Sequence, residues 1–356
     1  MVQLLDQPAF SLGQNEKTDW LTHDLNLLTR RHLDSCSVYR EIISRNRPAF
    51  KSIDRIEDVP FLPVRLFKHL ELLSVPKDSI VKTVTSSGTT DQRVSRVFLD
   101  KETSINQTRT LVKILQEFIG VQRMPMLIID HPNVIKNRQS FSARGAGILG
   151  LSNFGFDHTY ALMDESMEID HYRIDQFLEK HRGKKILLFG FTFMVWQYFV
   201  RKLESVSRRF EIDNGILLHS GGWKKLEAEA VSGDEFKARL DACSGIKRVH
   251  NFYGMAEQVG TVYMECEKGR LHVPVFSDVL IRDPINWSSL PIGCKGLVQV
   301  LSVIPMSYPG HSLITEDIGE ILGVDDCPCG RLGKTIRIHG RLAKAEVRGC
   351  SDTHAG

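Results

Sequence analysis

The chain has 356 residues, of which 42% are hydrophobic and 25% are charged, the composition of an ordinary globular protein. This composition excludes disordered and fibrous proteins, and a chain of this length can bury about 75% of the surface that its unfolded form exposes. The 46 basic and 43 acidic residues leave a net charge of +3 without a run of five like charges, so we expect no nucleic-acid partner.

The cysteines and the apolar segments indicate the cellular compartment of the protein. The seven cysteines are an odd number spread along the chain, and two form the pair Cys327-Pro-Cys329, which favours a reducing compartment and metal or thiol chemistry. The N-terminus lacks the basic segment of a secretory signal. The longest apolar run, residues 186–200, is shorter than the roughly 20 residues of a membrane-spanning helix. We therefore expect a cytoplasmic protein without a membrane span.

The first fifth of the chain is predicted to be helical. Its apolar side chains recur at helical spacing from residue 19 to residue 45 before Pro48 ends the pattern; they include Leu21, Leu25, Leu28, Leu33 and Tyr39. Residues 80–84 have the composition of a strand, and a short segment rich in hydroxyl groups follows them directly.

Strands and helices then alternate. A helix is predicted over residues 105–119, and strands are predicted at 126–130, 185–190, 215–219 and 248–252. This alternation indicates an α/β fold with a largely parallel sheet flanked by helices. The last hundred residues contain short apolar runs separated by Gly and Pro, which indicates a β-rich subdomain.

The hydroxyl segment is a candidate phosphate-binding loop, formed by Thr85, Ser86, Ser87, Gly88, Thr89 and Thr90. Glycine lets successive backbone N–H groups turn inward, and the hydroxyls add further donors for phosphate oxygens. No Gly-Lys-Ser/Thr sequence ends the segment, so it is not the loop of P-loop ATPases.

Three further segments follow in order: residues 220–223, residues 251–257 and residues 315–319. Together with the hydroxyl segment and Gly340-Arg341, they resemble the ordered motifs of the adenylate-forming enzymes, which activate carboxylic acids as acyl adenylates. The chain is most similar to the acyl-protein synthetase subunit of the fatty acid reductase complex of bacterial luminescence. That resemblance spans nearly the whole chain, including His272-Val-Pro274, Tyr308-Pro309 and Arg348-Gly-Cys-Ser351.

The resemblance implies the N-terminal domain of an adenylate-forming enzyme. Residues 1–340 would form this adenylation domain, with a helical region over 1–80 and a β-rich subdomain over about 260–340. Residues 341–356 would form a tail. The larger enzymes continue into a C-terminal lid domain with a catalytic lysine, which is expected to be lacking here, and Ala343 stands where they have an Asp or Lys hinge.

Each motif residue has a physically reasonable role at a nucleotide. Tyr253 offers a flat face for adenine, and Gly221 and Gly222 would let the base approach the backbone. Glu257 can hold the Mg²⁺ ion that bridges phosphate oxygens of ATP. Asp317 can accept hydrogen bonds from both ribose hydroxyls. Taken singly these residues have ordinary structural explanations, and it is their joint occurrence that favours the site.

Two roles come from the resemblance. Arg341 corresponds to the arginine that contacts ribose or phosphate just before the hinge. Cys350 corresponds to the cysteine that accepts the acyl group as a thioester, and a thiolate is a strong nucleophile toward an acyl adenylate. The implied partners are a carboxylic acid, of fatty or another class, and an acyl-accepting protein such as a reductase or an acyl carrier. The oligomeric state stays open.

Three cysteines and one histidine are candidate metal ligands: Cys266, His272, Cys327 and Cys329. Three thiolates and an imidazole suit a closed, structural Zn²⁺ site. The Cys327–Arg331 stretch also resembles phenylacetate-CoA ligases, in which a Cys-and-His zinc site can occur. The remaining cysteines within the folded part, Cys36, Cys243 and Cys294, are predicted to be small core residues.

Two other functions remain open at this point. An acid-CoA ligase of the phenylacetate-CoA ligase type would use coenzyme A directly and form no protein-bound acyl group. A non-catalytic, zinc-stabilised binding module would show no acid-dependent exchange between ATP and pyrophosphate.

Overall fold

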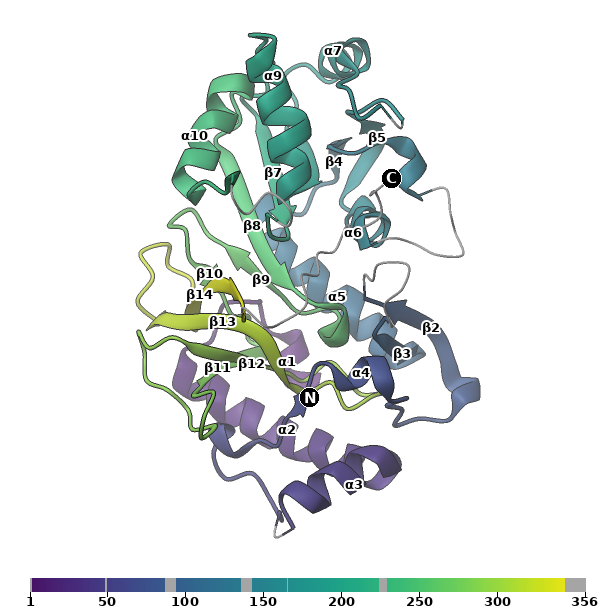
Figure 1. Ribbon diagram of the computed structural model, residues 1–356, viewed down its shortest axis with the longest axis vertical. Helices are drawn as coiled ribbons and strands as arrows, with labels where there is room; N and C mark the ends of the chain where they lie inside the picture. Colours follow the sequence, from purple (N-terminus) through teal and green to yellow (C-terminus); the bar gives the residue numbers. More distant parts are fainter. Residues whose placement is uncertain are drawn as a thin grey trace. The chain divides into compact units, whose positions relative to one another are not determined.

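The computed structural model describes residues 2–48, 50–86, 94–135, 143–164, 166–223 and 229–342 (Figure 1). These residues form two compact units. Unit 1 contains the residues up to Ser86, those from 94 to Phe118 and those from Tyr253 onward, and unit 2 contains Ile119–Phe252. The division into an adenylation domain, 1–340, and a tail, 341–356, stays a prediction, because residues 343–356 lie outside the described ranges.

The helical pattern near the N-terminus forms two helices, α2 (Gln14–Ser35) and α3 (Ser37–Asn46). Cys36 separates them because its backbone is extended, with φ −116° and ψ 101°. The apolar face of α2 is buried in unit 1. Unit 1 also contains α1 (Val2–Asp6), α4 (Leu66–His69), α5 (Lys101–Ile119), and the 3-10 turns η1 (Ile56–Asp58), η2 (Lys77–Ser79) and η6 (Ala256–Gln258).

The β-rich part of unit 1 is a mostly antiparallel sheet in the order β11-β12-β13-β14-β10-β9. Its strands are β9 (Val262–Glu265), β10 (Leu271–His272), β11 (Ser277–Arg282), β12 (Gly296–Ser302), β13 (Ser312–Val324) and β14 (Lys334–Arg341). A short strand, β1 (Leu62–Pro63), pairs with β13 in parallel. Strands β2 (Ile80–Thr85) and β3 (Arg96–Asp100) form a separate antiparallel pair.

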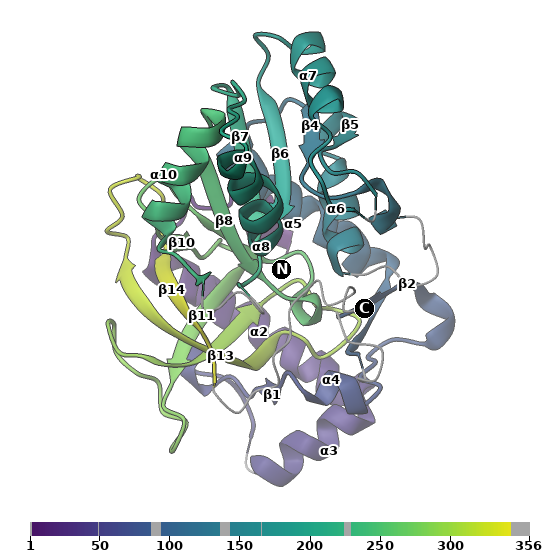
Figure 2. The same cartoon turned by 45° about the horizontal axis from the view of Figure 1, so that its top comes forward.

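Unit 2 contains five parallel strands in the order β8-β7-β6-β4-β5. They are β4 (Met124–Ile128), β5 (Gly155–Tyr160), β6 (Ile186–Phe191), β7 (Gly215–Ser220) and β8 (Arg248–Gly254), whose last two residues, Tyr253 and Gly254, belong to unit 1. The helical segments are η3 (Pro132–Ile135), α6 (Ala143–Ser152), α7 (His171–Lys180), α8 (Thr192–Val195), the π-helical η4 (Trp196–Val200), α9 (Arg201–Ser205) and α10 (Gly233–Ser244). Figure 2 shows β6, β7 and β8 side by side.

The α/β fold class predicted from the sequence is confirmed, including the parallel sheet and the β-rich region. The four strands predicted in the central part of the chain are β4, β6, β7 and β8. Strand β5 was not predicted, because it lies at the edge of the sheet and its residues Phe156–His158 are exposed, so it lacks the apolar run of a buried parallel strand. Within the described ranges, no helix has the length and apolarity needed to cross a membrane.

Candidate functional site

Two of the predicted nucleotide-binding residues contact each other in unit 1. The hydroxyl of Tyr253 donates a hydrogen bond of 2.6 Å to Asp317 Oδ2. Burial, followed by the negative charge of Asp317, raises the pKa of Tyr253 well above its ordinary value, so the hydroxyl remains a donor. One face of the Tyr253 ring packs on Tyr263, with ring centroids 6.0 Å apart. Tyr253 is therefore held in place by contacts at its ring and at its hydroxyl.

The pairing of β13 with β14 brings Arg341 to the same carboxylate. Asp317 and Arg341 are partners in the antiparallel register of these strands, and Arg341 Nε lies 3.6 Å from Asp317 Oδ1. The arginine side chain is 39% exposed, whereas that of Asp317 is 16% exposed. The guanidinium thus lies at the protein surface next to Asp317.

Glu257 lies in the turn η6 and is only 7% exposed. Burial raises the pKa of its carboxyl group; the Ser95 hydroxyl and the charge of Arg341 oppose this rise, and the charge of Asp317 adds to it. The electrostatic influence of Arg341 and Asp317 shows that the four residues Tyr253, Glu257, Asp317 and Arg341 belong to one cluster. A buried carboxylate of this kind is stabilised by a bound cation.

Ser86, near the start of the hydroxyl segment, is hydrogen-bonded to Ser95, whose hydroxyl acts on Glu257. Thr85 is the last residue of β2, and the Ser86 amide donates to Ser95 O at 3.1 Å. The Ser95 amide in turn donates to Ser86 Oγ at 2.9 Å. Ser87, Gly88, Thr89 and Thr90 lie outside the described residues. The sequence analysis missed Ser95, which has no motif of its own and is identified only by the β2–β3 pairing that brings it to Ser86.

Gly221 and Gly222 belong to unit 2 and are not part of this cluster of unit 1 residues. They follow β7, whose last residue, Ser220, donates from its hydroxyl to Phe252 O at 2.8 Å. Gly221 has φ +85°, and a Cβ atom there would lie 3.2 Å from the Phe191 ring, so the turn requires glycine. A Cβ at Gly222 would meet no atom within 4 Å. Cys350 lies outside the described residues.

The four candidate metal ligands converge within unit 1. Their ligand atoms, on Cys266, His272, Cys327 and Cys329, all lie within 4.8 Å of one another. Cys266 Sγ and Cys327 Sγ are 3.8 Å apart, and Cys329 Sγ is 3.3 Å from His272 Nε2. Tetrahedral bonds of normal length to Zn²⁺ would give separations of about 3.8 Å for two sulfurs and about 3.6 Å for sulfur and nitrogen. The arrangement therefore fits a zinc ion.

Three separate segments supply these ligands. Cys266 follows β9, His272 lies in β10, and Cys327 and Cys329 lie in the turn between β13 and β14. Burial lowers the pKa of His272 to about 4, which keeps the imidazole in the neutral form that binds metals. Among the other cysteines, Cys36 and Cys243 are buried as predicted, but the prediction for Cys294 is wrong. Cys294 is exposed, because it lies in the connection between β11 and β12 rather than in either strand.

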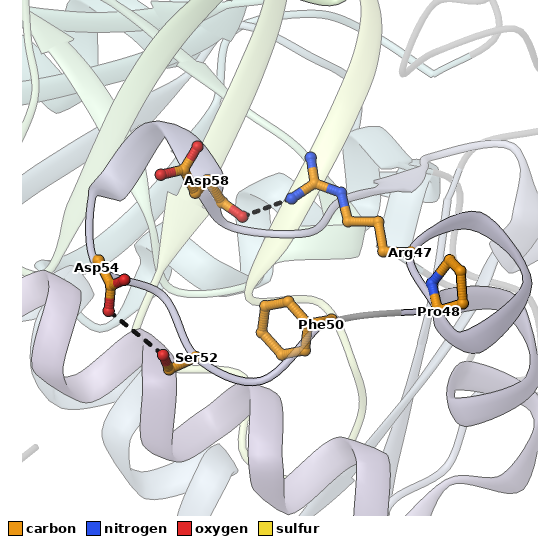
Figure 3. Close-up of a pocket in the computed structure, with 6 residues that line it drawn as sticks. All are labelled: Arg47, Pro48, Phe50, Ser52, Asp54 and Asp58. Carbon is orange, nitrogen blue, oxygen red and sulfur yellow. Dashed lines mark hydrogen bonds between the residues drawn. The ribbon is translucent and has the colours of Figure 1, made fainter.

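Described residues of unit 1 line surface cavities, and two of them are informative about where a ligand could bind. One has a volume of about 370 Å³ and is lined by residues of the α3–β1 connection, with Arg47 donating to Asp58 O at 2.6 Å (Figure 3). Neither the nucleotide cluster nor the metal cluster contributes to that lining. The other cavity, of about 380 Å³, lies next to the metal cluster, because Cys329 is one of its lining residues.

Comparisons with known proteins identify the family of this chain. The profile of the family described as "Acyl-protein synthetase, LuxE" matches residues 2–355. A relative, the long-chain-fatty-acid–luciferin-component ligase of Vibrio harveyi, is 22% identical over 316 residues, which cover 84% of this chain and 78% of the relative.

Solved structures of 2-hydroxyisobutyryl-CoA ligase are also similar. The open conformation, in complex with 2-HIB-AMP and CoA, has a TM-score of 0.69 at 15% identity over 96% of this chain and 79% of that chain. The postadenylation state has a TM-score of 0.70 at 15% identity, over 93% and 69% of the two chains. The likeness confirms the predicted fold of an adenylate-forming enzyme. With the family profile matching almost every residue, the chain belongs to the acyl-protein synthetase family.

Proposed function

We propose that the chain is an ATP-dependent acyl-protein synthetase that activates a fatty acid as acyl-AMP and transfers the acyl group to its own Cys350. The observation that carries the first half of this proposal is the convergence of Tyr253, Glu257, Asp317 and Arg341, with Ser95 joining Glu257 to Ser86 of the hydroxyl segment. The fatty class of the acid is supported by the Vibrio harveyi relative, whose name specifies a long-chain fatty acid.

Adenylation joins the acid to the α-phosphate of ATP. A carboxylate oxygen attacks the α-phosphorus, and the bond between this phosphorus and the pyrophosphate oxygen breaks. On binding ATP, Asp317 would exchange the hydrogen bond from Tyr253 for bonds from the ribose hydroxyls. Arg341 and the donors of segment 85–90 would stabilise the phosphate charge. Glu257 offers a carboxylate oxygen of the kind that Mg²⁺ prefers, and the bound ion supplies charge neutralisation as pyrophosphate leaves.

The second half-reaction forms a thioester. The Cys350 thiolate attacks the acyl carbonyl carbon of acyl-AMP, and AMP leaves with the electron pair of the broken acyl–phosphate bond. A partner protein, such as a reductase or an acyl carrier, would then take the acyl group from Cys350. The family membership of the chain supports this route over direct transfer to coenzyme A.

Acid-dependent exchange of radioactive pyrophosphate into ATP tests the first half-reaction. With Mg²⁺ and without coenzyme A, we expect exchange with at least one long-chain fatty acid in a panel that also contains short, aryl and hydroxy acids. Exchange requires only reversible adenylation, so it does not depend on the acyl acceptor. A panel that produced no exchange with any acid would favour a non-catalytic binding module. Formation of acyl-CoA without any protein-bound acyl group would favour the CoA ligase.

We also propose that Cys266, His272, Cys327 and Cys329 bind one structural Zn²⁺ ion. Four protein ligands leave no open position for substrate. Elemental analysis of the purified chain is expected to give about one zinc per chain, and Cys266→Ser is expected to lower this content. Cys243→Ser is the matched control, because Cys243 is equally a buried cysteine but lies in unit 2. This ligand set would be contradicted if the zinc content fell in Cys243→Ser and stayed at the parent value in Cys266→Ser.

A further inference from the structure

The four proposed zinc ligands differ in their access to solvent. Cys266 and His272 have no exposed surface and Cys327 is 7% exposed, whereas Cys329 is half-buried. Cys329 also lines the cavity of about 380 Å³, together with Pro8, Phe10, Ser11, Glu117, Gly330 and Arg331. One water molecule needs only about 15 Å³, so the cavity is large enough for a small solute. Of the four proposed ligands, Cys329 is the one that such a solute would contact first.

The cavity has a cationic wall next to this sulfur. The Arg331 guanidinium is held 4.3 Å from the centroid of the Phe118 ring, and it donates to Glu117 O at 3.1 Å. It also pairs with Glu267 at 3.2 Å. These contacts fix the Arg331 side chain as the wall of the cavity beside Cys329.

A second thiolate lies within reach of Cys329. The sulfur atoms of Cys266 and Cys327 are within 4.8 Å of that of Cys329, which is close enough for a disulfide to form after a small movement, since bonded sulfurs are about 2.0 Å apart. An accessible thiolate next to a resolving thiol is the arrangement that redox-sensitive cysteines share.

We propose that Cys329 is a site of oxidation by hydrogen peroxide, and that this oxidation would expel a bound zinc ion. The inference rests on the zinc site proposed above, and it does not depend on the acyl chemistry. It makes the metal centre a modification site whose oxidant enters from the cavity between the Pro8–Ser11 segment and Arg331.

The chemistry needs one peroxide and two thiolates. The Cys329 sulfur attacks one peroxide oxygen, the O–O bond breaks, and the leaving hydroxide takes a proton to become water, which leaves Cys329 as a sulfenic acid. The thiolate of Cys266 or Cys327 then attacks the Cys329 sulfur, forming the S–S bond and releasing a second hydroxide that also takes a proton. The peroxide is reduced to two waters and the two thiolates are oxidised to a disulfide. Zinc loses two of its four ligands and dissociates.

Zinc loss would affect the nucleotide cluster through the sheet. A bound metal would join the β9–β10 hairpin to the β13–β14 turn. Strand β13 carries Asp317 near its middle, and β14 ends at its partner Arg341. Releasing the turn removes a constraint on the register that keeps those two residues paired.

The test uses the full, zinc-loaded chain with a zinc-binding dye and peptide mapping by mass spectrometry. Peroxide is expected to release about one zinc per chain and to produce a disulfide between Cys329 and one of the two buried cysteines. Treatment with dithiothreitol and zinc should restore the original content. Ser11→Trp, which fills the cavity without changing a ligand, is expected to slow the release several-fold. Ser52→Trp, in the other surface cavity (Figure 3), is the matched control and should leave the rate unchanged.

Zinc that is retained while only the exposed Cys294 becomes oxidised would overturn the inference. So would equal release rates in the parent chain and Ser11→Trp, because the oxidant would then not enter through this cavity. A purified chain without zinc would instead contradict the zinc site itself. None of these three results would affect the adenylation proposal, which the exchange assay tests separately.

Discussion

Replacing Glu257 with glutamine is expected to lower the rate of acid-dependent ATP–pyrophosphate exchange by about 100-fold, the usual cost of losing one group that positions or neutralises charge at a reacting phosphate. Glutamine keeps the shape of the side chain but removes the negative charge that would hold Mg²⁺. The effect should be largest at low Mg²⁺ concentration, because the variant needs more metal to occupy the site. Initial exchange rates measured over a range of Mg²⁺ concentrations separate weaker metal binding from a slower chemical step.

The pH dependence of the same assay gives a second readout. Burial raises the pKa of Glu257 above its ordinary value, so the carboxylate is protonated at a higher pH than an exposed glutamate would be. As the pH falls through this raised pKa, the parent chain should lose affinity for Mg²⁺. The glutamine variant cannot titrate at this position, and its Mg²⁺ affinity should lack that component.

A control for Glu257→Gln is available in the same unit. Glu320 is 9% exposed, close to the 7% of Glu257, and it pairs with Arg337 rather than with the nucleotide cluster. Glu320→Gln should keep exchange near the parent rate. Melting temperatures will show whether either variant is unfolded, and Glu257→Gln is not expected to lose stability, because it removes a buried charge. The proposed role of Glu257 in Mg²⁺ binding would be contradicted if a folded Glu257→Gln chain catalysed exchange at the parent rate and with the parent Mg²⁺ dependence.

The second large effect is expected at Cys350. The Cys350→Ala chain, incubated with labelled fatty acid and Mg-ATP in the absence of coenzyme A, should lose all hydroxylamine-sensitive label, because it lacks the thiolate that forms the thioester. It should still catalyse pyrophosphate exchange, since adenylation precedes the thioester step. The measurement is label retained on the denatured chain before and after neutral hydroxylamine. Alanine is preferable to serine here because a serine could be acylated as a more stable oxygen ester.

Cys294 supplies the control for this experiment. It is an exposed free cysteine outside the metal cluster, so Cys294→Ala tests whether an accessible thiol takes up acyl groups without a specific role. We expect the parent amount of label in Cys294→Ala. Full label on the Cys350→Ala chain would rule out Cys350 as the acceptor while leaving the adenylation proposal intact. Together, Glu257→Gln and Cys350→Ala assign the loss of label to the first or the second half-reaction.

Some of these features could be read from the amino-acid sequence because they depend on local patterns. The buried parallel strands, such as β6, are nearly continuous apolar runs, and their burial on both faces gives them that composition. The proposed metal ligands stand out by residue type, since few groups other than thiolates and imidazoles serve a zinc site. The proposed nucleotide motifs stand out by their order along the chain.

Other features depend on contacts between distant residues. Ser95 has no sequence signal, and only the β2–β3 pairing brings it to Ser86. Cys327 and Cys329 are two residues apart, yet of the two it is Cys329 that lines the cavity of about 380 Å³, whose other walls come from the N-terminal segment and α5. The convergence of Asp317 with Tyr253 and Arg341 likewise arises from strand pairing and side-chain packing. Sequence determined which kinds of groups this protein has available, because local pattern and residue chemistry are properties of short segments. Which groups meet, and which of them solvent reaches, was decided by the tertiary structure, because long-range packing alone sets those distances and exposures.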